Sequence, residues 1–206
     1  MRVRLPPSAP MKKVIGLIGE KGSGKQTFVN FLKQIATEPS APRNDRGEVL
    51  NIRQVRFSDI LAQTLMIWDL PISRVNLQKL AIMMNETFGE TALANAAKFS
   101  IEGDNADVVI FDGIRREAEL KLVRGMKNHL LLYITAKQNL RYQRLKKRSE
   151  KVGETHLTYE QFLAEEKSKA EESISSLGKI ADKKLGNNGS LEEFKNKISQ
   201  LARQLL

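Results

Sequence analysis

A glycine-rich stretch at residues 19–27 has the spacing of a phosphate-binding loop and reads Gly-Glu-Lys-Gly-Ser-Gly-Lys-Gln-Thr. The pattern G-x-x-x-x-G-K-[ST] is matched at Gly19, Gly24 and Lys25. Its last position holds Gln26, and Thr27 comes one residue late. Glycines let such a loop turn tightly, so that backbone N–H groups point at phosphate oxygens and the lysine reaches the β- and γ-phosphates. Because an apolar run at residues 14–18 precedes the loop and an amphipathic stretch follows it, the sequence predicts a nucleoside triphosphate site rather than a flexible surface turn.

A second candidate for phosphate chemistry is Asp112, which follows the apolar run at residues 108–111. A carboxylate at the end of a buried strand holds Mg²⁺, directly or through water, as a Walker B element does. The alternative is a plain Asp-Gly turn after the strand. In a chain that also carries the glycine-rich loop, the metal interpretation is favoured, and Thr27 and Asp112 are the predicted Mg²⁺ ligands.

The elements that must position these residues alternate between strand and helix. Strands are expected at residues 14–18, 49–57, 107–111, 130–134 and 181–185. Helices are expected at residues 24–36, 73–89, 91–101, 117–123 and 138–148, and from residues 58, 159 and 191 onward. This alternation predicts a three-layer α/β fold, a parallel sheet with helices on both faces. Ligands of such sheets bind at the carboxyl ends of the strands, where the loop and Asp112 would meet.

Composition narrows the function classes. The chain has no cysteine, which excludes disulfides, thiolate metal sites and a cysteine nucleophile, and its two histidines form no zinc-ligand pattern. No apolar run approaches the ~18–20 residues that cross a bilayer, so a soluble cytoplasmic protein without membrane contact is expected. Residues 1–11 are expected to be a disordered leader before one domain at residues 12–206. The net charge of +10 suits a polyanionic ligand, either a nucleotide or nucleic acid.

Two further segments resemble a known family. Residues 112–116, Asp-Gly-Ile-Arg-Arg, resemble the Asp-Gly-x-x-Arg element of P-loop nucleoside monophosphate kinases. Residues 187–193, Asn-Asn-Gly-Ser-Leu-Glu-Glu, resemble a segment of dephospho-coenzyme A kinases and of adenylate-kinase-like proteins. The Gly-Lys-x-Thr form of residues 24–27 also resembles the adenylate-kinase-like loop. The similarity runs from about residue 12 to the C-terminus, with interruptions at residues 38–48 and 71–104.

The resemblance implies a P-loop kinase that uses ATP and Mg²⁺ for phosphoryl transfer. It implies ATP contacts at Gly19, Gly22, Ser23, Gly24, Lys25, Gln26, Thr27, Asn187 and Asn188. It implies catalytic roles for Lys25, Asp112, Arg141, Arg144 and Arg148. The three arginines share one helix face and resemble the arginines of a lid with its tip at residues 149–157; the alternative is a solvated basic face. Residues 71–104 would form a helical acceptor-binding arm.

The acceptor is the open part of the prediction. The candidate acceptor contacts are Asp59, Arg74, Arg115 and Arg116. Asp59 resembles an Asp of dephospho-coenzyme A kinases, or else it forms a helix N-cap with Ser58. Adenylate kinases have an acceptor-gripping arginine where this chain has Ala62, and Arg56, Arg74 or Arg115 is the candidate substitute. Arg74 either faces the cleft or lies on the surface. The leading acceptor is a nucleoside or deoxynucleoside monophosphate, with dephospho-coenzyme A as the rival.

A hypothesis from another class also stays open. The same fold can carry an ATP-hydrolysing switch or a factor associated with nucleic acid, and the positive charge is compatible with that role. The leading expectation is a small-molecule nucleotide partner and a monomer or small homo-oligomer.

Overall fold

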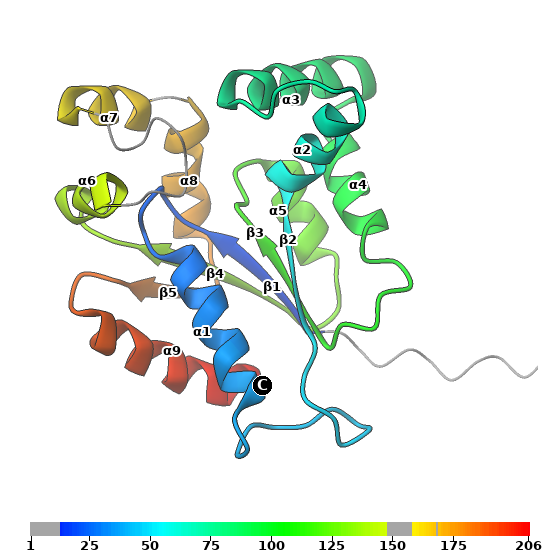
Figure 1. Cartoon of the computed structure of the whole chain (residues 1–206), viewed down its shortest axis with the longest axis vertical. Coiled ribbons are helices and arrows are strands. Elements are labelled where there is room, and N and C mark those ends of the chain that lie inside the picture. The colour runs from blue at the N-terminus through cyan, green and yellow to red at the C-terminus, as the bar shows by residue number, and fades with distance from the viewer. Residues whose placement is uncertain (1–12, 148–157, 168) are drawn as a thin grey trace, which may run out of the picture.

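The computed structural model describes residues 13–147, 158–167 and 169–206, and a parallel β-sheet lies at its centre (Figure 1). Within these residues the strands are β1 (Lys13–Ile18), β2 (Ile52–Arg56), β3 (Val108–Asp112), β4 (His129–Thr135) and β5 (Lys183–Gly186). They lie in the order β2-β3-β1-β4-β5, and every neighbouring pair is parallel. Each predicted strand is confirmed, although β2 is shorter than residues 49–57 because Phe57 already begins a helix.

Helices cover both faces of this sheet, which confirms the predicted three-layer α/β fold. One face carries α1 (Lys25–Thr37) and α9 (Leu191–Leu205). The other carries α2 (Phe57–Ile67), α4 (Ala92–Phe99), α5 (Glu117–Arg124) and α8 (Lys169–Lys179), with α3 (Arg74–Phe88) packed on α2 and α4. Helices α6 (Gln138–Lys147) and α7 (Tyr159–Glu166) lie, like α3, beyond the carboxyl ends of the strands (Figure 1).

The core holds the strand ends in place from both sides. Along β1, Ile15 and Leu17 pack with α1 and α9, whereas Val14 and Ile18 pack with the opposite helix layer. All four side chains are buried, because a central parallel strand has a helix layer on each face. Each such side chain contributes about 1.5–3 kcal/mol through burial, so the segment that follows Ile18 starts from a rigid support.

Helix boundaries follow the capping signals of the sequence at three places. Ser73 caps α3 by accepting a hydrogen bond from the Asn76 backbone N–H, and Gly89 follows the end of that helix. Capping boxes begin α7 at Thr158 and α9 at Ser190, as predicted. The two capping boxes fix the residues at which α7 and α9 begin.

Two predictions of local structure differ from the fold. The N-cap expected at Ser58 and Asp59 is wrong, because α2 already begins at Phe57 and its N-cap is Arg56. Asp59 instead lies in the first turn, where its carboxylate faces the positive end of the helix dipole. Helix α8 was not predicted, since its sequence lacks a capping signal and has few apolar residues. The leader predicted at residues 1–11 and the lid tip at residues 149–157 lie outside the described residues.

The strand register brings the predicted chemistry together at one edge of the sheet. Asp112, the last residue of β3, pairs with Leu17 of β1 on one side and with Arg56 of β2 on the other. The glycine-rich segment starts two residues after Leu17, so both elements open onto the same carboxyl edge. The predicted arm, residues 71–104, comprises α3, which lies beyond this edge, and α4, which packs on one face of the sheet (Figure 1).

Candidate active site

Residues 19–24, here called the phosphate loop, connect β1 to α1, and neighbouring elements pack against two of its glycines. Gly22 and Gly24 have φ angles of 72° and 107°, a region that residues with a side chain rarely adopt. A Cβ atom at Gly22 would lie 2.7 Å from the Arg141 carbonyl oxygen. A Cβ atom at Gly24 would lie 2.4 Å from Nδ2 of Asn187. Glycine is therefore required at both places by conformation and by space.

Lys25 begins α1 and folds back across the phosphate loop. Its Nζ donates hydrogen bonds to the carbonyl oxygens of Gly19, at 2.6 Å, and Glu20, at 3.1 Å. Ser23 is fully buried, and its Oγ has no hydrogen-bond partner among the residues that the structure describes. A buried hydroxyl without a partner is costly, and a phosphate oxygen would supply the missing acceptor. The loop thus has the donors and the positive charge that a polyphosphate needs.

Asp112 carries the second unsatisfied group of the site. Gln54 Nε2 donates to its Oδ2 at 2.7 Å, and the Nε of Arg56 lies 3.5 Å from the same oxygen. The other oxygen, Oδ1, is buried and has no hydrogen-bond partner within the described ranges 13–147, 158–167 and 169–206. Since a buried carboxylate oxygen is rarely left unpaired, Oδ1 fits the place of a Mg²⁺ ion or of one of its water ligands.

The sequence did not predict that Gln54 and Arg56 lie beside Asp112. Gln54 and Arg56 alternate along β2 and present their polar ends at the carboxyl edge of the sheet. Both also contact the side-chain oxygen of Gln26, which connects β2 to the first turn of α1. Thr27, the other predicted Mg²⁺ ligand, is half-buried in that turn. The sequence signal that could have identified Gln54 and Arg56 is a pair of polar residues two positions apart at the end of a predicted strand.

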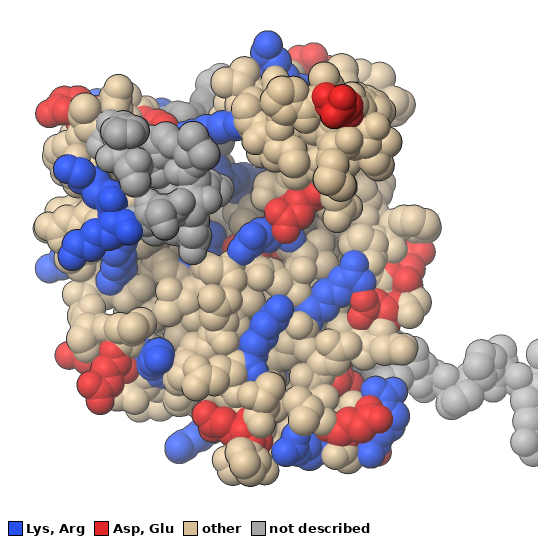
Figure 2. Space-filling view, viewed as in Figure 1, with Lys and Arg blue, Asp and Glu red and all other residues tan. Residues whose placement is uncertain are grey.

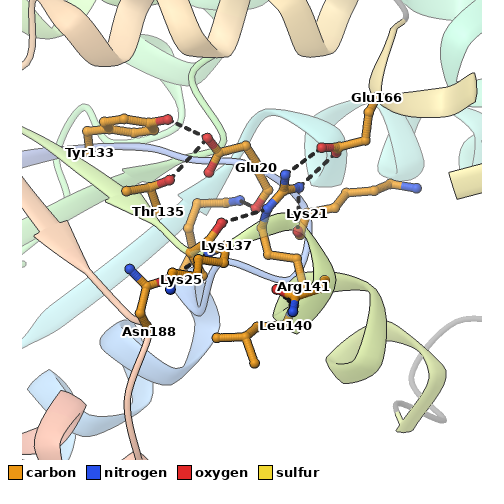
Figure 3. A network of polar contacts seen from close by, with 12 residues as sticks. Glu20, Lys21, Lys25, Tyr133, Thr135, Lys137, Leu140, Arg141, Glu166 and Asn188 are labelled. Carbon is orange, nitrogen blue, oxygen red and sulfur yellow. Dashed lines mark hydrogen bonds and ion pairs between the residues drawn. The ribbon is translucent and has the colours of Figure 1, made fainter. Parts of the chain in front are cut away.

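Two of the three arginines predicted for a lid, Arg141 and Arg144, contact the phosphate loop and its neighbours. Arg141 is 5% exposed and forms a bidentate ion pair with Glu166 of α7, at 2.8 and 2.5 Å (Figure 3). Arg144 donates to the backbone and side-chain oxygens of Asn187, at 3.1 and 3.3 Å. Burial lowers the pKa of Arg144 from its usual value. Arg148 lies outside the described residues.

Helix α6 therefore has a mixed character. Arg141 is buried, whereas Lys146 and Lys147 are exposed, and Figure 2 shows basic side chains gathered over this helix. A wholly solvated basic face, the alternative considered for this segment, does not describe Arg141.

Two asparagines after β5 connect to the loops at the same edge. Asn187 is 6% exposed, and its Nδ2 donates to the Ser23 carbonyl oxygen at 2.9 Å. Asn188 is exposed and accepts a hydrogen bond from the Lys137 backbone N–H at 2.7 Å. Both side chains thus contact neighbouring loops, and the predicted contact with adenine stays a prediction.

Glu20 adds a carboxylate to the phosphate loop that the sequence prediction did not use. Its Oε1 accepts hydrogen bonds from the Tyr133 hydroxyl and from Thr135 Oγ1, both on β4 (Figure 3). Its Oε2 is buried and has no hydrogen-bond partner. Burial and the hydrogen bond with Glu20 raise the pKa of Tyr133 to about 12, so the tyrosine stays a donor at neutral pH. The sequence signal that could have identified Glu20 is its position as a charged residue in the glycine-rich loop.

The predicted acceptor residues surround the same edge but differ in exposure. Asp59 and Arg74 are exposed, and Arg74 pairs with Glu165 of α7 at 2.6 Å. Arg115 and Arg116 follow β3, and the Nη1 atom of Arg116 is buried and lacks a hydrogen-bond partner in the described part of the chain. Backbone N–H groups of both arginines donate to Glu119 Oε2, at 2.7 and 3.1 Å, which fixes the course of this turn.

The phosphate loop, the parallel sheet and the helices on both of its faces define a three-layer α/β fold of the P-loop type. In the solved structures, TT1252 from Thermus thermophilus has a TM-score of 0.60 and 19% identity, covering 95% of this chain and 98% of that one. Shikimate kinase from Bacteroides thetaiotaomicron has a TM-score of 0.57 and 10% identity, covering 93% and 98%. At these identities the likeness establishes the fold alone.

The sequence is also similar to archaeal proteins of the UPF0200 type. The protein from Sulfurisphaera tokodaii is 27% identical over 195 residues, which span 94% of this chain and 98% of that protein. The protein from Methanoregula boonei is 29% identical over 191 residues, which span 91% and 94%. No family model matches the chain. In the described part, no helix has the length and apolar character to span a membrane.

Proposed function

We propose that this protein is an ATP-dependent phosphotransferase that moves the γ-phosphoryl group of ATP to a small nucleotide-like acceptor. The observation that carries the proposal is the placement of Lys25 and the unpartnered Oδ1 of Asp112 at neighbouring strand ends of a P-loop kinase fold. Phosphoryl transfer needs positioning and charge stabilisation rather than covalent chemistry by the protein, and these groups supply both.

ATP and Mg²⁺ are the proposed cofactors. The backbone N–H groups of the phosphate loop and Lys25 would hold the β- and γ-phosphates, and Ser23 Oγ would gain a partner there. Asp112 Oδ1 would hold the metal directly or through water. In the described residues, no group of three or more His, Cys, Asp or Glu side chains could hold a metal ion, so phosphate oxygens and water would complete its coordination. Asn187 and Asn188 are proposed to lie beside the base.

The leading acceptor is a nucleoside or deoxynucleoside monophosphate. Three arginines support an anionic acceptor, because Arg74, Arg115 and Arg116 come from the arm and the β3 turn that border the carboxyl edge. A phosphate nucleophile is already ionised and needs no general base, but it needs cations that offset its repulsion from ATP.

Dephospho-coenzyme A is the second candidate acceptor, and one observation favours it. Asp59 follows β2 with an exposed side chain, and a carboxylate at such a place can orient or deprotonate a ribose hydroxyl. Activity on this acceptor that is lost in D59N and kept in S58A would favour it over a monophosphate.

The test is ATP consumption with Mg²⁺ across nucleoside monophosphates, deoxynucleoside monophosphates and dephospho-coenzyme A, with a reaction that lacks an acceptor as control. We expect one acceptor to stimulate ATP consumption at least about tenfold. ATP loss that no acceptor stimulates would contradict the proposal and favour an ATPase or switch. DNA and RNA belong in the same panel, since a nucleic-acid-associated factor would respond to them and lose binding at high salt.

A further inference from the structure

Glu165 of α7 joins two cations that come from distant parts of the chain. Its Oε2 accepts a hydrogen bond from Lys21 Nζ in the phosphate loop at 2.8 Å. Its Oε1 accepts one from Arg74 Nη1, at the start of α3, at 2.6 Å. One carboxylate therefore holds a P-loop lysine and an arm arginine together, each through a separate oxygen. Lys21 was not among the predicted site residues.

The contact is partly withdrawn from solvent. The exposed side-chain fractions are 19% for Lys21, 29% for Glu165 and 47% for Arg74. Burial raises the pKa of Glu165, but the hydrogen bonds from Arg74 and Lys21 outweigh this effect and hold its pKa below the usual value. At neutral pH the carboxylate is thus an anion between two cations, where ion pairs are less screened than on an open surface.

Helix α7 has other anchors and does not need Glu165 to stay in place. Glu166 forms the bidentate pair with Arg141, and the Arg141 guanidinium lies 5.6 Å from the centre of the buried Phe162 ring. Tyr159 and Phe162 also pack against Tyr142 of α6, with ring centres 5.0 and 5.6 Å from it. Glu166 and the aromatic side chains therefore hold α7 on α6, whereas the ion pairs of Glu165 among the described residues are with the two cations that border the proposed acceptor space.

Carboxylate and phosphate are both oxyanions, and an ammonium and a guanidinium that converge on one will bind the other. We propose that Lys21 and Arg74 form the binding place for the anionic group of the acceptor, and that Glu165 occupies this place until the acceptor displaces it. The identity of the ligand as an acceptor phosphate rests on the proposed function; the anion site itself does not.

This arrangement has a measurable consequence for affinity. A ligand that must displace an internal occupant binds with an affinity reduced by the fraction of molecules in which the place is free. Removing the charge of Glu165 should therefore strengthen anion binding, whereas removing another acid of α7 should not. Glu160 is the matched control, because it is exposed on the same helix and its change to Gln alters the net charge equally.

The test is isothermal titration with inorganic phosphate at constant ionic strength. We expect E165Q to bind phosphate about tenfold tighter than E160Q, a ratio equivalent to about 1.4 kcal/mol, and E160Q to match the unmodified protein. Adding K21Q or R74Q to E165Q should remove the gain. Equal affinity of E165Q and E160Q would overturn the proposal, and so would a gain that survives both K21Q and R74Q.

The same variants separate this site from the proposed function. Phosphate binding requires no turnover, so an acceptor panel without activity leaves the titration intact. If an acceptor is found, E165Q should lower its KM several-fold while the KM for ATP stays unchanged. A purely structural role for Glu165 would shift both KM values or lower kcat, and that outcome would reject the subsite even in an active kinase.

Discussion

Lys25 and Asp112 are the side chains on which the proposed phosphoryl transfer depends most. Lys25 follows the loop after β1 and Asp112 ends the neighbouring strand β3, so both would contact the same bound polyphosphate and its metal ion. Lys25 Nζ already lies over the phosphate loop, held by two of its carbonyl oxygens. Asp112 presents an oxygen that nothing in the described part of the protein satisfies. Charge that is positioned before the reaction is the main source of catalysis in phosphoryl transfer.

The first prediction concerns Lys25. K25A should lower kcat for ATP turnover by about 10²-fold or more, because the charge that faces the transferring group is lost. Far-UV circular dichroism should be unchanged, since the two described hydrogen bonds of Lys25 go to carbonyl oxygens of the loop and not to a neighbouring helix or strand. K33A, a change of an exposed lysine in the same helix, is the control and should keep full activity. Full activity in K25A would refute the assignment of the phosphate loop.

The second prediction concerns the metal. D112N should raise the Mg²⁺ concentration for half-maximal activity by about tenfold or more, because a neutral amide is a weaker ligand for Mg²⁺ or its water. D45N, in an exposed loop, is the control. A titration of activity with Mg²⁺ measures the effect, and an unchanged midpoint in D112N would argue against a metal at Oδ1.

At this scale the sequence predicted residues on contiguous motifs and missed those that converge from different elements. Lys25 and Asp112 stand at fixed positions after apolar runs, so pattern alone finds them. Gln54 and Glu165 reach the site only through the pairing of β2 with β3 and the packing of α7, and no local spacing encodes such contacts. Glu20 lies in the predicted loop, but its contact with Tyr133 depends on the pairing of β1 with β4.

Among the elements, the segment after β5 and α6 act together as a support for the phosphate loop. Asn187 donates to the Ser23 carbonyl oxygen and accepts from Arg144, and the Gly22 backbone packs directly against Arg141. Arg141 and Arg144 contact backbone carbonyl oxygens of the loop. Their contact with the transferring phosphoryl group stays a prediction.

This support gives a third prediction. N187A should lower the free energy of unfolding by about 1–3 kcal/mol and raise the KM for ATP, because a buried hydrogen-bond partner of the loop is lost. N188A, at an exposed position, should change stability far less. Chemical denaturation measures the first effect, and equal stability of the two variants would contradict it. The ratio of activity with ATP to that with GTP in both variants tests the predicted contact with the base.

A fourth prediction follows from the start of α5. Burial raises the pKa of Glu119, although the N–H groups of Arg115 and Arg116 act in the opposite direction. Its folded-state pKa therefore exceeds the unfolded one, so its contribution to stability is full below the unfolded pKa and declines as pH rises through the folded pKa. The unmodified protein should lose stability relative to E119Q between pH 4 and pH 8. Unfolding free energies of both proteins across this range measure it, and a constant difference would contradict the assignment.

Elements with an explicit boundary signal were the predictable ones. The caps at Ser73, Thr158 and Ser190 marked α3, α7 and α9 correctly. The start of α2 was misplaced because Phe57 continues the apolar pattern of β2 yet lies in the helix. Helix α8 packs through Ile174 and Leu177 into the core, but its polar composition hid that stripe.

At the scale of the whole molecule, the central strand of the sheet, β1, leads directly into the phosphate loop. The alternation of strands and helices predicted the parallel three-layer fold, but the order β2-β3-β1-β4-β5 depends on which strands pair, and that information is not local. The same limit applies to the acceptor. Its proposed contacts come from the arm, the β3 turn and α7, which become one site only in the folded protein.

The net charge of +10 is a property of the whole molecule that fits both a nucleotide enzyme and a nucleic-acid-associated ATPase. The two functions differ in the molecule that receives the γ-phosphoryl group: an organic acceptor in a kinase and water in an ATPase. The most direct measurement is therefore to incubate the protein with γ-³²P-labelled ATP, Mg²⁺ and each acceptor, and to separate the labelled products. Label on an organic acceptor, lost in K25A and kept in K33A, is the result we predict; label found only in inorganic phosphate would contradict a kinase.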